Sequence, residues 1–245
     1  MLSKSEIKYI QSLFQKKFRD TENCYLAEGP KIVDEALNTP GITVKKVWGL
    51  TEWVQQYQPL HPEVEMIAVA PFELEKLSQL KTPNETVALI EKNNTDHTGW
   101  QHRSALVLAL DGIQDPGNLG TIIRTADWFG VPGIVCSTDC ADVYNSKVVQ
   151  ATMGSLFRIP VAYTDLPGWL AGQQDVAVYG AVLNGQPLDK KQEAASGILI
   201  IGNESKGIRP DVATHLTHKI TIERIGAAES LNAAVATGIL LAHLK

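Results

Sequence analysis

The clearest pattern of apolar and polar positions lies in the middle of the chain, over Leu106–Ser137. A short apolar run at 106–110 has the length of a buried parallel strand, and a loop rich in Asp, Pro, Gly and Asn follows it. Apolar residues then recur at helical spacing until Gly130, where the pattern of a helix end appears. A second apolar run occupies 134–136. This order of strand, loop, helix and strand predicts a unit of a parallel α/β sheet.

The N-terminal part of the chain shows the same alternation on a smaller scale. Short apolar runs typical of strands alternate with segments of helical spacing, which indicates a small α/β domain. The predicted strands are 24–27, 44–48, 66–69 and 87–90, and the predicted helices are 3–19, 30–38, 51–57 and 72–79. A polar stretch without apolar period then predicts a domain boundary. We therefore expect domains at 1–95 and 104–245, joined by a linker at 96–103.

The second domain continues with alternating strand and helix patterns. Strands are expected at 157–161, 176–182, 198–201 and 219–222, and helices at 145–153, 166–173 and 231–244. The last helix is apolar on nearly every side, which is typical of a helix buried from several directions. It is either a central core helix or a helix shared with a second copy of the chain. Because packing on one sheet leaves part of it in water, we favour a homodimer.

Composition and charge narrow the class of protein. The chain has 245 residues, a net charge of −5 and 44% hydrophobic residues, as in soluble globular proteins. No apolar run approaches the roughly 20 residues of a membrane span, and the N-terminus does not resemble a signal peptide. Three cysteines without metal-ligand spacing predict reduced thiols in the cytoplasm. We therefore expect no membrane and no metal among the partners.

The mild acidity argues against general nucleic-acid binding, but a local basic patch is sufficient for it. Lys16, Lys17 and Arg19 form such a cluster on the first predicted helix. They are either a solvated helix face or a contact for an RNA phosphate backbone.

Three polar loops follow predicted strands of the second domain. One carries Asn118, with Arg124 at least one turn into the helix that follows, the next carries Glu204, and the last carries Ser230 and Asn232. Each residue alone is accounted for by helix capping or by a solvated charge. In a parallel sheet, however, these loops open on the same edge, and together they indicate a binding site. The glycine spacing excludes a P-loop and a dinucleotide-binding fingerprint.

These loops contain segments that resemble the three motifs of the SpoU family, the S-adenosylmethionine-dependent RNA 2′-O-ribose methyltransferases of the SPOUT superfamily. The segments are DGIQDPGNLGTIIRTA at 111–126, IIGNESKGI at 200–208, and ESLNAAVA at 229–236, with Ile222 seven residues before Glu229. The resemblance covers about residues 104–245. More loosely, YLAEG at 25–29 is similar to the substrate-binding domain that precedes the catalytic domain in many members.

The resemblance implies an α/β fold whose C-terminal parallel-sheet domain forms a deep trefoil knot, preceded by a small α/β substrate-binding domain. It also implies a homodimer and S-adenosyl-L-methionine as methyl donor, with no metal. Backbone groups around four residues would hold the donor, and these residues are Leu183, Gly202, Ile222 and Leu231. Where the family usually has I-P-M, Ile222 is followed here by Glu223 and Arg224, a charged pair near the expected adenosine pocket.

Arg124 resembles the catalytic arginine of the family. Because a guanidinium stays protonated, we expect Arg124 to grip the neighbouring phosphate and stabilise the developing alkoxide, and not to act as a base. Asn118 and Glu204 are expected to hold the loops and the arginine in place, and Ser230 and Asn232 to fix the third loop.

The function implied by the resemblance is RNA 2′-O-methylation. Ribosomal RNA is favoured over tRNA, because members with an appended N-terminal domain often act there. The alternatives are a tRNA 2′-O-methyltransferase and a non-catalytic RNA-binding protein that kept the fold. The presence of all five motif residues argues against the non-catalytic protein.

Overall fold

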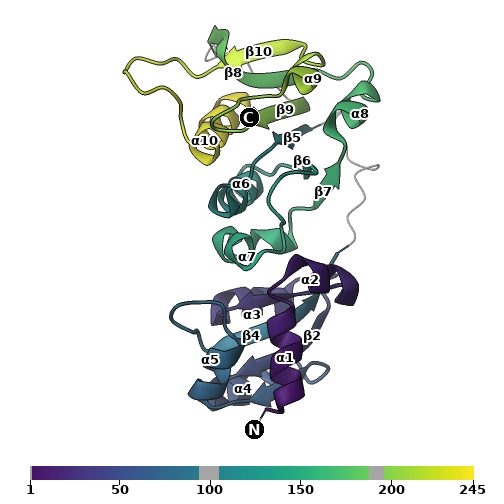
Figure 1. Ribbon diagram of the computed structural model, residues 1–245, viewed down its shortest axis with the longest axis vertical. Helices are drawn as coiled ribbons and strands as arrows, with labels where there is room; N and C mark the ends of the chain where they lie inside the picture. Colours follow the sequence, from purple (N-terminus) through teal and green to yellow (C-terminus); the bar gives the residue numbers. More distant parts are fainter. Residues whose placement is uncertain (1, 94–104, 188–195) are drawn as a thin grey trace. The chain divides into compact units, whose positions relative to one another are not determined.

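The computed structural model describes residues 2–93, 105–187 and 196–245 (Figure 1). The chain divides into two compact units, one of Met1–Asn94 with Tyr144–Phe157 and the other of Thr95–Val143 with Arg158–Lys245. A segment from the second half of the sequence therefore packs with the first unit. The expected linker at 96–103 lies outside the described residues, so the domain boundaries stay a prediction.

The first unit is built on a four-stranded sheet in the order β1-β4-β2-β3. Two strands, β1 (Cys24–Glu28) and β2 (Val44–Gly49), pair antiparallel with β4 (Thr86–Glu91), and β3 (Glu65–Ala68) pairs parallel with β2. All four strands were predicted from the apolar runs within two residues at each end. Their alternating side chains serve two apolar layers, one on each face of the sheet.

One layer lies under α3 (Pro30–Asn38), α4 (Thr51–Tyr57) and α7 (Ser146–Thr152), and the other lies under α1 (Lys4–Ser12) and α5 (Pro71–Leu77). Val149 of α7 belongs to the first layer, and the Gln150 side chain donates a 2.7 Å hydrogen bond to the carbonyl oxygen of Glu28. These contacts explain why the segment around α7 belongs to this unit.

The helix predicted over 3–19 is two helices, because the chain turns after α1 and α2 (Lys16–Glu22) begins afresh. Arg19 is only 4% exposed, and its Nη1 donates to the carbonyl oxygens of Leu13 and Phe14 at 2.8 and 2.9 Å. Carbonyl groups at a helix end lack hydrogen-bond donors within the helix, and the Arg19 guanidinium donates to them instead. Arg19 is thus a buried structural residue, which corrects its expected place on an RNA-facing surface. Lys16 and Lys17 are exposed.

The second unit is a six-stranded parallel sheet in the order β10-β8-β9-β5-β6-β7, as the sequence predicted for its class. Its strands are β5 (Leu106–Asp111), β6 (Ile134–Ser137), β7 (Val161–Thr164), β8 (Val178–Pro187), β9 (Gly197–Gly202) and β10 (His218–Thr221). The strand predicted at 157–161 was wrong. A short 3-10 helix, η1 (Ser155–Phe157), lies there, and β7 begins only after Pro160.

Helices cover both faces of this sheet (Figure 1). Alternate residues of β5 point to opposite faces, and Val107 and Ala109 share an apolar layer with residues of α8 (Leu166–Ala171) and α9 (Pro210–Ala213). On the other face, α6 (Pro116–Trp128) packs against α10 (Ala233–Leu244). In the described part of the chain, no helix is long and apolar enough to cross a membrane.

The two helices α6 and α10 run side by side in the same direction. At their starts, Asn232 Nδ2 donates to Asn118 Oδ1 at 2.8 Å. At their ends, the Lys245 ammonium donates to the carbonyl oxygens of Phe129 and Gly130, both at 2.9 Å, and a cation there is favourable for the dipole of α6. This alignment brings the loops that precede both helices to the same end of the sheet.

Candidate functional site

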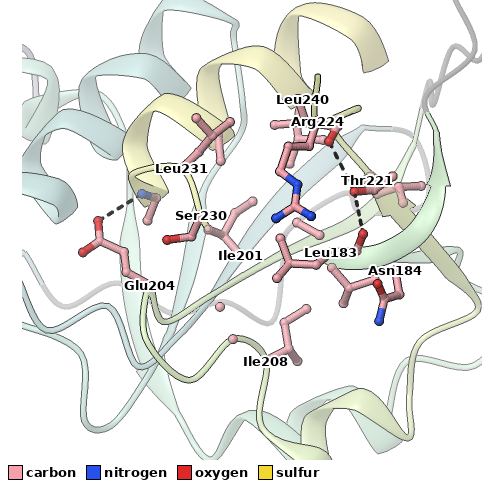
Figure 2. A pocket seen from close by; sticks show the side chains of 18 of the residues that line it. Leu183, Asn184, Ile201, Glu204, Ile208, Thr221, Arg224, Ser230, Leu231 and Leu240 are labelled. Atoms are coloured by element: carbon pink, nitrogen blue, oxygen red, sulfur yellow. Dashed lines mark hydrogen bonds between the residues drawn. The ribbon is translucent and has the colours of Figure 1, made fainter. Parts of the chain in front are cut away.

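A cavity of about 730 Å³ lies at the carboxyl-terminal ends of β8, β9 and β10 (Figure 2). This volume is within the range of small-molecule sites, roughly 300–1,000 Å³. Apolar side chains such as Leu183, Ile201, Ile208 and Leu240 line it together with charged residues from the surrounding loops. All four residues expected to surround the methyl donor lie in this lining, and they are Leu183, Gly202, Ile222 and Leu231.

The carboxylate of Glu204 connects the three loops. Its Oε1 accepts hydrogen bonds from Asn118 Nδ2 at 2.7 Å, from Asn232 Nδ2 at 3.0 Å and from the backbone N–H of Ala233 at 3.1 Å. The carboxylate therefore lies at the N-terminal end of α10, where the helix dipole favours negative charge. Three residues that are far apart in the sequence form one polar cluster, which we call the Glu204 cluster (Asn118, Glu204 and Asn232).

Local sequence explains why the helices begin at this cluster. Asp115 is the N-cap of α6, and its Oδ1 accepts from the Asn118 N–H at 2.8 Å. Asn232 is the N-cap of α10, and its Oδ1 accepts from the N–H groups of Ala234 and Val235. Both residue types are preferred at N-caps. Asn232, and not Ser230, therefore caps the last helix, which begins two residues later than predicted.

Ser230 lines the cavity, whereas Arg124 does not. Arg124 is exposed on α6, and in the described part of the chain it makes no hydrogen bond or ion pair. At about 100° per residue, it lies on a different side of the helix from Asn118, six residues earlier. Asn118 and Glu204 are bonded to each other and to Asn232, and the described part of the chain shows no bond from either to Arg124, so their holding of Arg124 stays a prediction.

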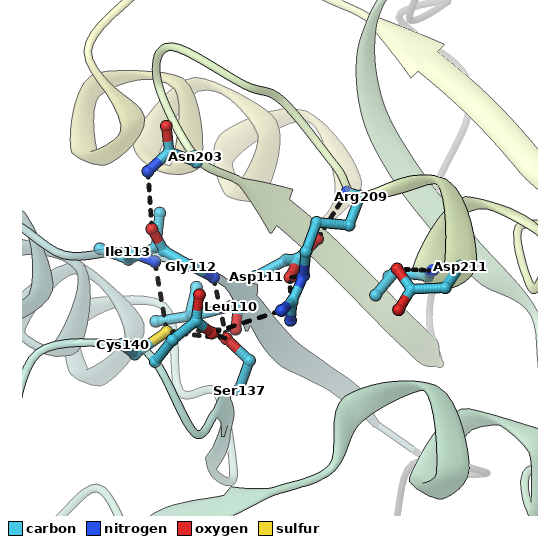
Figure 3. Close-up of polar contacts among 11 residues, drawn as sticks. Leu110, Asp111, Gly112, Ile113, Ser137, Cys140, Asn203, Arg209 and Asp211 are labelled. Carbon is cyan, nitrogen blue, oxygen red and sulfur yellow. Dashed lines mark hydrogen bonds and ion pairs between the residues drawn. The ribbon is translucent and has the colours of Figure 1, made fainter.

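The loop after β5 is held by a second set of contacts that the sequence did not reveal (Figure 3). The carboxylate of Asp111 is buried at the end of β5, and Arg209 donates to it through its backbone N–H at 2.7 Å and its Nε at 2.6 Å. An ion pair between Arg209 Nη2 and Asp111 Oδ1 measures 2.6 Å. Asn203 Nδ2 donates to the Gly112 carbonyl oxygen at 2.8 Å. These bonds join the first and second motifs.

The same loop also donates hydrogen bonds to side chains at and after the end of β6. The Gly112 N–H donates to Ser137 Oγ at 2.9 Å, and the Ile113 N–H donates to Cys140 Sγ at 3.2 Å. A hydrogen bond from Cys136, followed by those from Ser137 and the backbone, lowers the pKa of the Cys140 thiol to about 7, although burial opposes the shift. No sequence signal pointed to these residues, because the cysteines lack metal-ligand spacing.

Arg209→Ala is expected to lower the free energy of unfolding by about 1–2 kcal/mol, because it leaves the buried Asp111 carboxylate with fewer donors. The Arg209 side chain is 39% exposed, so water limits the loss. Urea unfolding measures the effect. Arg209→Lys keeps the positive charge but loses the two-nitrogen geometry of the guanidinium. Its free energy of unfolding should lie between those of the wild type and the alanine variant. An alanine variant as stable as the wild type would contradict the role of this ion pair.

Comparison with known proteins places this site in a family. Residues 105–242 match the model of the SpoU rRNA Methylase family, and residues 4–88 match the MRM3-like substrate binding domain. The chain is 34% identical to the 23S rRNA (guanosine(2553)-2′-O)-methyltransferase of Bacillus subtilis (strain 168), over 98% of this chain and 96% of that protein. The chain therefore belongs to the SpoU methylase family.

Solved structures agree with the sequence match. A putative RNA methyltransferase of the TrmH family from Porphyromonas gingivalis superposes with a TM-score of 0.89 at 35% identity, covering 100% of this chain and 98% of that one. The SpoU methyltransferase AviRb from Streptomyces viridochromogenes, solved in complex with AdoMet, gives 0.86 at 27% identity, covering 99% and 97%. In the described residues of our protein, no group of His, Cys, Asp and Glu is placed to hold a metal ion.

Proposed function

We propose that this protein transfers a methyl group from S-adenosyl-L-methionine to the 2′-hydroxyl of a ribose in ribosomal RNA. The observation that carries the proposal is the cavity whose three loops meet at the Glu204 cluster, in a chain of the SpoU methylase family. The 34% identity to the 23S rRNA (guanosine(2553)-2′-O)-methyltransferase of Bacillus subtilis supports this class of RNA. The alternative substrate is tRNA.

The cavity fits the proposed donor. It combines an apolar wall, suited to an adenine ring, with polar and charged groups suited to an amino-acid end. Bound there, S-adenosyl-L-methionine supplies an electrophilic methyl group on a sulfonium. The lining residues Leu183, Gly202, Ile222 and Leu231 would hold it. The Glu204 cluster holds the segments next to Gly202 and Leu231 together, and positioning of this kind is a large part of what such a site contributes.

Arg124 would act on the RNA. Methyl transfer to the 2′-oxygen releases S-adenosylhomocysteine and one proton, and this proton goes to solvent water because a guanidinium cannot accept it. Arg124 instead holds a neighbouring phosphate and stabilises the negative charge that develops on the 2′-oxygen. Since Arg124 does not line the cavity of its own chain, we propose that it serves the cavity of a second copy.

The exposed side of α6 and α10 is the proposed dimer surface. Trp128, at the end of α6, is 85% exposed, and Val235, near the start of α10, is 51% exposed, so exposed apolar side chains lie near both ends of the helix pair that carries Arg124. We take this side of the two helices as the interaction site. A second copy seated there covers these side chains and brings Arg124 to the partner's cavity.

Trp128→Glu is expected to convert a dimer into a monomer, because it places a charge in the apolar surface. Analytical ultracentrifugation at micromolar concentration measures the change. Leu60→Glu is the matched control, since Leu60 is 66% exposed but lies in the other unit, and it should sediment as the wild type does. A wild-type protein that sediments as a monomer would refute the dimer.

We also propose a knot, the place of action and an RNA-binding role for the N-terminal unit, because the chain belongs to the SpoU methylase family. The N-terminal unit would bind the RNA, with the exposed Lys16 and Lys17 contacting its backbone. The deep trefoil knot implied by the family would involve the segment 222–232, which lines the same cavity as 202–208. The protein would act in the cytoplasm, without a metal.

Transfer of labelled methyl from S-adenosyl-L-methionine tests the function. Separated rRNA and tRNA pools from cells that lack this gene are the acceptors. Label in rRNA supports the proposal, and label in tRNA alone moves the substrate to tRNA. Absence of label in both, together with absence of donor binding, would favour the non-catalytic RNA-binding protein.

A further inference from the structure

Arg224 is a cation that lines the cavity and has no role in the methyl transfer described above. It lies on the loop between β10 and α10 and lines the cavity, and Figure 2 shows its side chain reaching in toward Leu183 and Ser230. Its only hydrogen bond in the described part of the chain runs from Nη1 to the Ala228 carbonyl oxygen, at a long 3.4 Å. A guanidinium has five N–H donors, so most of its capacity is unused.

The acidic residues of the lining do not neutralise Arg224. Glu204 is occupied by the bonds of its cluster. Glu223 and Glu229 form no ion pair with Arg224 within the described residues. The cavity therefore presents a guanidinium that is free to pair with an anionic group of a ligand.

The chemistry of the donor identifies that group. S-adenosyl-L-methionine carries an ammonium, a sulfonium and one carboxylate, so only the carboxylate attracts a guanidinium. The planar fork of an arginine matches a carboxylate through two parallel hydrogen bonds. The uncharged adenosine is left to the apolar wall, so this pairing puts Arg224 at the amino-acid end of the donor and not at the adenosine pocket expected from the motif. The positive charge of Arg224 also repels the sulfonium. Arg224 therefore contacts the carboxylate end of the donor.

We propose that Arg224 binds the carboxylate of the methyl donor and so selects ligands that carry the amino-acid end; this rests on the proposed function. Arg224 acts here in donor recognition and takes no part in proton transfer. Loss of a partly exposed charge-assisted contact should weaken binding by roughly tenfold.

Isothermal titration calorimetry on the full-length protein measures the affinities for two ligands. Both are thioethers and lack the sulfonium charge of the methyl donor. S-adenosylhomocysteine has the carboxylate, and 5′-methylthioadenosine lacks the whole amino-acid end. Arg224→Met should weaken binding of S-adenosylhomocysteine by roughly tenfold and leave 5′-methylthioadenosine within about twofold of the wild type. Lys219→Met removes another cation of the lining and should keep the wild-type ratio of the two affinities. The affinity of Arg224→Lys for S-adenosylhomocysteine should lie between that of Arg224→Met and that of the wild type.

Three results would overturn the assignment. Equal weakening of both ligands would mean that Arg224 shapes the cavity without recognising the carboxylate. Unchanged binding of both, with a raised KM for RNA, would assign Arg224 to an RNA phosphate. A wild-type protein that binds neither ligand would overturn the proposed function together with this inference, whereas the first two results leave the function standing. Because Arg224 is exposed and has one long hydrogen bond, the variant should fold, and its thermal transition checks this.

Discussion

Arg124→Ala is expected to lower the rate of methyl transfer by roughly 10²–10³-fold while the affinity for S-adenosylhomocysteine stays at the wild-type value. The rate falls because the group that stabilises the developing charge on the 2′-oxygen is gone. The affinity stays because the proposed contacts of Arg124 are with the RNA and not with the methyl donor. The stability should also be unchanged, since Arg124 is exposed and unbonded in the described part of the chain. Single-turnover kinetics and calorimetry measure the two quantities separately.

Two controls define how Arg124 works. Arg124→Lys keeps the charge but loses the bidentate geometry, and near-normal turnover in this variant would refute the proposed fork. Mixed dimers of Arg124→Ala with Glu204→Ala test which chain supplies the arginine. If Arg124 serves the partner's cavity, each mixed dimer has one complete site and activity returns. If it serves its own cavity, the mixture stays as inactive as its parents.

Glu204→Ala is expected to lower kcat/KM by roughly 100-fold, with a smaller loss of about 1 kcal/mol in the free energy of unfolding. The substitution removes the acceptor shared by Asn118, Asn232 and the Ala233 N–H, so the three loops are no longer held together. The effect on stability is small because Glu204 is exposed and water replaces part of the lost bonding. Steady-state kinetics and urea unfolding give both values.

Glu204→Gln is the matched variant, because it keeps one acceptor oxygen without the charge. It should retain more activity than the alanine variant. The double variant of Glu204→Ala with Asn118→Ala should lose less activity than the sum of the two single variants, since both changes break the bond between Asn118 and Glu204. It should still be worse than Glu204→Ala alone, because Asn118→Ala also removes the acceptor of the Asn232 side chain. Fully additive losses would mean that the cluster does not act as a unit.

The sequence predicted the parallel sheet and the polar loops because these depend on local patterns. The apolar run of β5, the N-cap residues Asp115 and Asn232, and the spacing of the motifs are all visible in short stretches. Burial from both faces makes such strands apolar throughout, and this signal is strong. The convergence of the three loops follows from the rule that parallel strands end at one edge.

Interactions between distant segments were not predictable in the same way. Arg209 and Asp111 are 98 residues apart, and no local pattern joins them. Arg19 resembles its neighbours Lys16 and Lys17 in charge, yet the turn between α1 and α2 buries it. The orientation of Arg124 depends on which side of α6 faces the cavity, which the motif alone does not specify.

The chemical linkage of the transferred methyl group distinguishes methylation of the ribose oxygen from methylation of a base. Ribosomal RNA labelled by the wild-type protein is hydrolysed with alkali, a cleavage that requires a free 2′-hydroxyl. Methylation of the ribose oxygen blocks this cleavage, so the label is expected in alkali-stable dinucleotides and should be lost with Arg124→Ala. Label recovered in mononucleotides would place the methyl group on a base and would refute 2′-O-methylation by this protein.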